Sequence, residues 1–286
     1  MDTQFWVIQA FNGVSYGALL FLLASGLSLI FGVMRIVNLA HGSFFLLGGY
    51  VALTVIWTTG SWLLALPVAA FVIAVVGLLM ERVFLRRLGF DPLRQVLLTV
   101  GFAYLFQQAA LDIWGGDNLD IIPPGMLKET AVFGGFHFPM YRIFMIGMAL
   151  VMGLILWVTM EKTRAGAMIR ATVDDAEMAR GVGIDTSRVS MFIFALGAFL
   201  AGLGGVIGGA FLGVYPGLDF AILPIAFAVV IIGGMGSLSG AAVGSLLVGL
   251  ADNFGKALFP EISYFTLYAP MVLILALKPM GLFGRE

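Results

Sequence analysis

Residues 3–34 read TQFWVIQAFNGVSYGALLFLLASGLSLIFGVM and contain no Asp, Glu, Lys or Arg. A helix that crosses the hydrocarbon core of a bilayer needs about 20 mostly apolar residues. Six further charge-free runs follow, at residues 36–80, 95–111, 143–160, 189–218, 220–251 and 262–277. The 286 residues are 61% hydrophobic and only 11% charged, with a mean hydropathy of +1.06. This pattern predicts an all-α, polytopic bundle of helices in the lipid bilayer.

Two of these runs contain an internal break. Residues 36–80 are interrupted by WTTGSW at 57–62, and residues 220–251 by GGMGSLSG at 233–240. Splitting both runs gives nine segments, and a further break is expected near residues 38–43. The segment at about 219–235 is short and contains Pro224, so it reads as either a half-helix or a full crossing. The sequence therefore predicts eight or nine spans with broken or half-helices.

The basic residues predict an orientation. With nine crossings and the N-terminus outside, the segments 34–41, 81–94, 161–188 and 278–286 lie inside and hold 12 of the 15 Lys and Arg. Cytoplasmic loops carry an excess of Lys and Arg, so this arrangement agrees with the positive-inside rule. Eight crossings would move Lys278 and Arg285 outside, which favours nine. Residues 1–4 lack a basic residue, so we expect no cleaved signal peptide.

The sequence also excludes several kinds of protein. A net charge of −1 argues against a nucleic-acid binder, and there are no cysteines. The two histidines, His41 and His137, are too far apart in the chain to form a paired metal motif. There is no phosphate-binding loop motif, and the G-x-S-x-G match at residues 13–17 opens an apolar helical run instead of a strand-turn-helix. We therefore expect no catalytic site, metal or cofactor.

Glycines are concentrated late in the chain, with 14 of the 38 between residues 197 and 249. Some repeat at four-residue spacing, which allows membrane helices to approach closely. A static packing seam and a sliding or pore-lining surface are both compatible with the pattern. The helix-packing candidates are Gly205, Gly209, Gly213, Gly236, Gly240 and Gly244.

The loop at residues 161–188 contains ten charges, five of each sign. Arg170, Asp174 and Glu177 are spaced as on one helix face, which predicts a short amphipathic helix that Gly181 and Gly183 would end. The nearby apolar residues are unusual for a free loop. A solvated linker and a helix docked into a groove on another protein both remain open.

Four blocks carry a resemblance to a known family. They are GVMRIVNLAHGSFFLLGGY (32–50), IRATVDDAEMARGVGI (169–184), GGMGSLSGAAVG (233–244) and KPMGLFG (278–284). The chain resembles the permease subunits of branched-chain amino acid ABC transporters, of the LivH type. Lys278 and Met280 stand where that family usually has Arg and Gln.

The resemblance implies a single permease domain over residues 1–286 of a multi-pass protein in a bacterial or archaeal cytoplasmic membrane. It also implies a complex with a second, LivM-like permease, two ABC ATPase subunits and an extracytoplasmic substrate-binding protein, which would dock on the outer loop 115–142. The block 169–184 would be the coupling helix seated on an ATPase. The candidate ATPase-coupling residues are Arg170, Asp174, Asp175, Ala176, Glu177, Met178, Ala179, Gly183 and Ile184.

The implied mechanism is ATP-driven import of branched-chain or other small apolar amino acids past the broken helices. The pathway candidates are Asn38, His41, Ser43 and Ser237. Import of urea or short amides by the same family stays open as an alternative. A stand-alone channel or secondary transporter would work without ATP, and a membrane enzyme would need a catalytic constellation that the sequence lacks.

Overall fold

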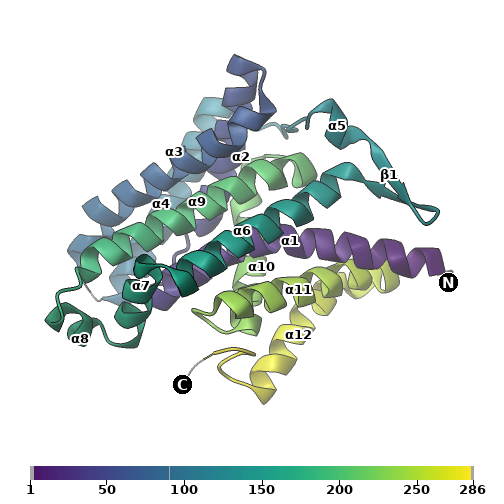
Figure 1. Cartoon of the computed structure of the whole chain (residues 1–286). Helices are drawn as coiled ribbons and strands as arrows, with labels where there is room; N and C mark the ends of the chain where they lie inside the picture. The colour runs from purple at the N-terminus through teal and green to yellow at the C-terminus, as the bar shows by residue number, and fades with distance from the viewer. Residues whose placement is uncertain (1–2, 90, 285–286) are drawn as a thin grey trace.

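The computed structural model describes residues 3–89 and 91–284, which form one helical bundle (Figure 1). Its longer helices include α1 (Thr3–Met34), α2 (His41–Thr59), α3 (Trp62–Val83), α4 (Pro92–Trp114), α6 (Met140–Lys162), α9 (Thr186–Leu212), α10 (Leu218–Gly233), α11 (Leu238–Leu258) and α12 (Ser263–Leu277). The shorter elements are η1 (Leu85–Leu88), α5 (Gly125–Lys128), β1 (Thr130–Phe133), β2 (Phe136–Pro139), α7 (Arg164–Asp174), α8 (Ala176–Gly181) and η2 (Pro260–Ile262).

Within the described residues, seven helices are long and apolar enough to cross a membrane. The segments at 218–233 and 265–277 are apolar but shorter. The prediction of an all-α membrane bundle is thus confirmed, and both internal breaks fall where the sequence placed them. The described residues depart from the all-α prediction at one small antiparallel hairpin, β1 and β2, in the loop before α6.

Helix α1 lies at the centre of the bundle. It packs against α9 and α11 along most of its length and also contacts α6 and α10. Its side chains from Leu19 to Ile30 are almost all buried, as expected for a helix that is apolar on every side. By contrast, α4 and α6 expose large apolar side chains such as Leu97, Leu105 and Leu154. In a membrane-spanning bundle these exposed faces are suited to lipid.

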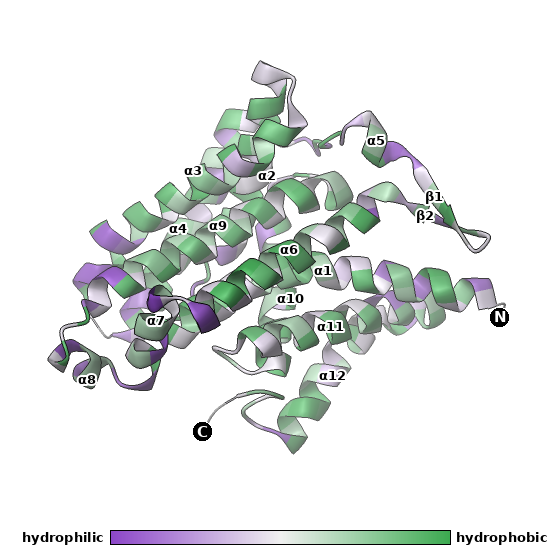
Figure 2. Ribbon diagram, viewed as in Figure 1, coloured by the Kyte–Doolittle hydropathy of each residue, from purple (hydrophilic) through white to green (hydrophobic). Residues whose placement is uncertain are grey.

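Polar residues gather at the ends of the bundle. Figure 2 shows hydrophilic residues around α7, α8 and the neighbouring ends of α3 and α4, with apolar residues between. The hairpin and the start of α1 lie at the opposite end (Figure 1). Arg285, expected at the inner side, lies outside the described residues.

Candidate translocation pathway and coupling loop

The chain is non-helical between α1 and α2, at residues 35–40, close to the further break expected near residues 38–43, and we call this connection the first break. Buried polar side chains hold it. Asn38 Oδ1 accepts a hydrogen bond from the Ala40 backbone N–H at 3.1 Å, and Thr99 Oγ1 of α4 accepts one from the Leu39 N–H at 3.2 Å. Asn38 and Thr99 are both fully buried. Non-helical backbone at membrane depth must find hydrogen-bond partners in the protein or in a water-filled cavity, because the lipid offers none. These side chains therefore stabilise the turn between α1 and α2.

The start of α2 lies beside the middle of α1 and not at its end. The His41 Nε2 atom is 2.9 Å from the carbonyl oxygen of Leu23, well inside α1. The imidazole is completely buried, and its Nδ1 atom has no hydrogen-bond partner among the described residues. Residues 35–40 thus return the chain into the interior before α2 begins.

The starts of α2 and α10 meet at a buried hydrogen bond. Ser43 Oγ donates to Asp219 Oδ2 at 2.9 Å, and both residues are buried. Gly42 allows the approach, because a Cβ atom there would lie 3.1 Å from Leu223 Cβ and still closer to the Asp219 carbonyl oxygen. Asp219 was not among the sequence candidates. The signal was present, since it is the only charged residue between positions 189 and 251.

The second break, residues 234–237, is built from glycines and backbone bonds. Gly234 and Gly236 have φ angles of 100° and 82°, which favour glycine. Ser237 caps α11 by accepting a hydrogen bond from the Gly240 N–H at 3.0 Å, and its carbonyl oxygen accepts one from Ser28 Oγ at 3.3 Å. Ser237 is only partly buried, whereas the other three pathway candidates are buried. Its carbonyl oxygen contacts α1 at Ser28.

The C-terminal block closes the same break. The backbone N–H groups of Leu282 and Phe283 donate to the carbonyl oxygens of Ile232 and Gly233, each at 2.9 Å. These carbonyls belong to the last turn of α10, which has no helical partners for them. Two sequence blocks that are far apart, 233–244 and 278–284, are therefore joined through their backbones.

The four pathway candidates lie close together along α1. His41 contacts it at Leu23 and Ser237 at Ser28, five residues apart, which corresponds to about 7.5 Å along a helix. Asn38 and Ser43 flank His41 in the chain. The structure therefore brings both breaks to the same part of α1, around Leu23 and Ser28.

The packing glycines allow backbones to touch. A Cβ atom at Gly205 would collide with the Phe45 carbonyl, and one at Gly240 with the Gly233 carbonyl. Gly244 similarly faces Val229, and Gly209 would meet Ile121 and Val214 at 2.7 Å. A Cβ atom at Gly236 would lie 2.9 Å from the Cα atom of Gly32. The four-residue pattern does not continue as one helical seam, because α9 ends at Leu212 and Gly213 forms a turn with a φ of 78°.

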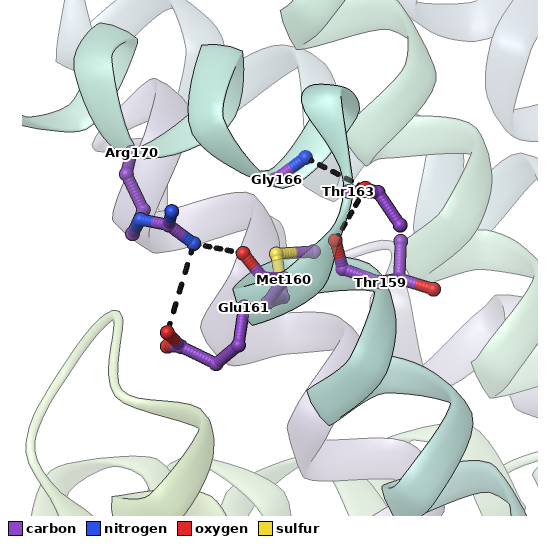
Figure 3. Close-up of polar contacts among 6 residues, drawn as sticks. All are labelled: Thr159, Met160, Glu161, Thr163, Gly166 and Arg170. Carbon is purple, nitrogen blue, oxygen red and sulfur yellow. Dashed lines mark hydrogen bonds and ion pairs between the residues drawn. The ribbon is translucent and has the colours of Figure 1, made fainter.

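The charged loop folds as two short helices. Figure 3 shows how the first, α7, is fastened to the end of α6: Arg170 donates to the Met160 carbonyl oxygen and lies 3.9 Å from Glu161. Thr163 caps α7 by accepting from the Gly166 N–H at 3.1 Å. A Cβ atom at Gly166 would collide with the Met160 carbonyl. A cation near the last carbonyls of α6 is also favoured by the helix dipole.

The prediction of one helix through Arg170, Asp174 and Glu177 is wrong. Asp175 ends α7 and caps α8, accepting hydrogen bonds at 2.9 Å from the N–H groups of Glu177 and Met178. A side chain that competes for backbone N–H groups in this way starts a new helix. The Arg170 side chain reaches back to α6 and does not pair with Asp174 or Glu177.

Helix α8 ends as the sequence predicted. Gly183 has a φ of 91°, and the Ile184 N–H donates to the Ala179 carbonyl oxygen at 3.0 Å. This geometry is the glycine-based helix stop known as the Schellman motif. Ala179 is buried against the rest of the chain, Ala176 and Ile184 are partly buried, and Asp174 is exposed. Met178 and Val182 are 66% and 72% exposed.

The chain is similar to known permeases over its whole length. The sequence profile of the family described as branched-chain amino acid transport system / permease component matches residues 9–275. The Escherichia coli K12 high-affinity branched-chain amino acid transport permease LivH is 30% identical over 100% of this chain and 98% of its own length. BraD of Pseudomonas aeruginosa is 28% identical over 97% and 95%. The E. coli permease LivM is 28% identical over 91% of this chain and 67% of its own. No solved structure gives a match.

Proposed function

The chain belongs to the family of permease components of branched-chain amino acid transport systems, and we propose that it forms half of an ATP-driven import pathway together with a second, LivM-like permease. It is a multi-pass, non-catalytic permease subunit. The observation that carries the proposal is the match to LivH over the full chain. The proposed cargo is a branched-chain or similar small apolar amino acid, and hydrolysis of ATP belongs to two partner ATPase subunits.

The proposed topology has nine crossings, with the N-terminus outside and the C-terminus in the cytoplasm. Arg82, Arg86, Arg87 and Arg94 lie at the α3–α4 connection, and five further Lys and Arg lie in residues 161–188 around α7 and α8, which supports this orientation because cytoplasmic loops are rich in basic residues. Helix α10 has 16 residues and is about 24 Å long, shorter than a hydrocarbon core of about 30 Å. It would cross the membrane only with help from the non-helical residues at its two ends.

The proposed pathway runs beside the two breaks, past Asn38, His41, Ser43 and Ser237. Broken helices in transporters commonly form the substrate route, because their free polar groups can contact a solute. The buried positions of the first three residues in this single chain support a closed state. Rocking against the second permease would open this region to one side at a time.

The proposed ATPase contact is α8 with the connection to α7. Met178 of α8 and Val182, which follows α8 directly, are exposed apolar side chains, and α8 lies at the end of the bundle where Figure 2 shows hydrophilic residues. Apolar side chains on a short helix suit a groove on another protein. Arg170 and Gly166 fasten α7 to α6, so a push on α8 would be carried to a membrane-spanning helix.

The proposed surface for the binding protein is the outer loop at 115–142. The hairpin of β1 and β2 gives this loop a fixed shape, and a bridge between Leu119 and Val214 attaches it to the start of the α10 region. Contact at this loop would therefore reach the residues next to Asp219.

A pull-down from the native membrane tests the proposed assembly. We expect an affinity-tagged chain to bring two ATPase subunits, a second permease and, with substrate, a binding protein. A stand-alone transporter would purify without an ATPase and would transport without ATP, and that result would overturn the proposal. An importer of urea or short amides would assemble in the same way but would not carry amino acids.

A double substitution tests the coupling contact. We expect M178D/V182D to lose ATPase association and uptake, because charged side chains replace exposed apolar ones in the contact. The matched control is M126D in the outer loop, whose side chain is 81% exposed. It should keep ATPase association. Full association and uptake in the double variant would contradict the assignment of α8.

A further inference from the structure

Asp219 is a buried carboxylate with no cationic partner among the residues that the structure describes. It is 2% exposed, and the ion pairs of the described chain involve other acids. The other deeply buried aspartate, Asp252, is paired with Lys256 at 2.7 Å. Asp219 therefore differs from Asp252, whose charge Lys256 neutralises.

The described residues around Asp219 stabilise its carboxylate only in part. Ser43 donates to Oδ2, the backbone N–H groups of the first turn of α10 (Gly217, Asp219 and Phe220) lie close to the carboxylate, and this end of the helix dipole favours negative charge. Oδ1 still has no well-aligned hydrogen bond in the described chain. An isolated carboxylate is costly in an apolar interior, and charged residues inside a membrane usually serve function. A donor or cation from outside this chain would complete the site.

Further polar and aromatic groups lie next to the carboxylate. The buried Tyr50 is close enough for electrostatic interaction with Asp219, and its hydroxyl has no partner in the described chain. The Tyr50 ring stacks on Trp114 with centroids 4.9 Å apart. A carboxylate beside an unpartnered phenol hydroxyl suits an organic ammonium group, whose several N–H donors can bond both oxygens.

A metal ion fits this set less well. Calcium binds six to eight oxygen ligands and magnesium a near-ideal octahedron, often with several carboxylates. No group of three or more potential His, Cys, Asp or Glu metal ligands exists in the described part of the chain. The available chemistry is one carboxylate, a serine hydroxyl and a phenol.

We propose that Asp219, positioned by Ser43, receives the ammonium group of the amino acid as it passes through the permease. This inference rests on the proposed function and adds a recognition step inside the membrane domain. It makes the permease selective for solutes with an ammonium group over neutral amides of similar shape.

The test uses the complete transporter in proteoliposomes, with radiolabelled leucine at saturating loaded binding protein. Asp219→Asn keeps an oxygen that can accept from Ser43 but removes the charge. We expect D219N to lower the uptake rate roughly 10- to 100-fold, since a hydrogen bond to a charged group contributes about 1.5–3 kcal/mol. If Asp219 takes no part in transport, an assembled D219N complex keeps the wild-type uptake rate. The control D112N removes the charge of an exposed acid on α4 and should leave uptake unchanged.

The outcomes separate the two claims. If the wild-type complex fails to carry leucine but carries short amides, the proposed function fails. If the wild-type complex carries leucine and an assembled D219N complex matches its rate, the ammonium assignment alone is overturned. Should D219N fail to assemble by size-exclusion chromatography, the same comparison is made with D219S, and uptake at the wild-type rate by an assembled D219S complex overturns the assignment equally.

Discussion

Residues 35–40 and residues 234–237 both interrupt helices beside α1, but different groups hold them. At the first break, the side chains of Asn38 and Thr99 bond the backbone. At the second, glycines allow close approach, and the backbone of Leu282 and Phe283 bonds the end of α10. Side-chain bonds can be removed one at a time, whereas a backbone contact tolerates no added atom. The two breaks should therefore respond differently to substitution.

The largest effect is expected at the second break. In Gly240→Val, the new side chain would collide with the Gly233 carbonyl, which cannot move without separating α10 from α11. Overpacking a core typically costs about 1–3 kcal/mol, and a collision with backbone should cost at least the upper end of that range. Unfolding with SDS in mixed micelles measures this loss. Gly101→Val on α4 is the control, because nothing lies within 4 Å of the added Cβ, and its stability should stay near wild type.

An intermediate effect is expected at the first break. Thr99→Val keeps the shape of the side chain but removes the acceptor of the Leu39 N–H. An unsatisfied buried N–H costs about 1–3 kcal/mol. The same unfolding measurement applies, with Thr58→Val as the control because Thr58 is exposed and bonds only its own helix. Equal stability of both variants would mean that side chains do not hold this break.

The smallest effect is expected for Ser237→Ala. This substitution removes the cap of α11 but none of the backbone bonds of the second break. Loss of an N-cap costs about 1 kcal/mol. Ser61→Ala at the exposed start of α3 removes a similar cap and should cost about the same. A loss above about 3 kcal/mol at Ser237 alone would show that its side chain holds the break.

The sequence predicted the breaks because polar and glycine residues stand out within apolar runs. It placed the interruptions at 57–62 and 233–240 correctly and identified Gly183 as a helix stop. The same reasoning missed the hairpin, although Gly134 and Gly135 between apolar residues are a turn signal. Four-residue strands are too short for periodicity to reveal.

Other features depended on hydrogen bonds and turns that residue spacing alone does not reveal. Asp175 fits the periodic pattern of one helix, and only its bonds to Glu177 and Met178 reveal two. Gly213 continues a four-residue spacing beyond the end of α9, where it serves a turn instead. Asp219 could have been noticed as a lone charge in an apolar stretch. Its contact with Ser43, 176 positions away, could not be read from the sequence.

The most direct test of the central claim is uptake of radiolabelled leucine by proteoliposomes that contain the complete complex. ATP is enclosed in the lumen with the ATPase subunits, and loaded binding protein is added outside. Our account predicts that leucine accumulates only when ATP is present and this chain is part of the complex. Equal uptake without ATP, or from vesicles that lack this chain, would contradict it.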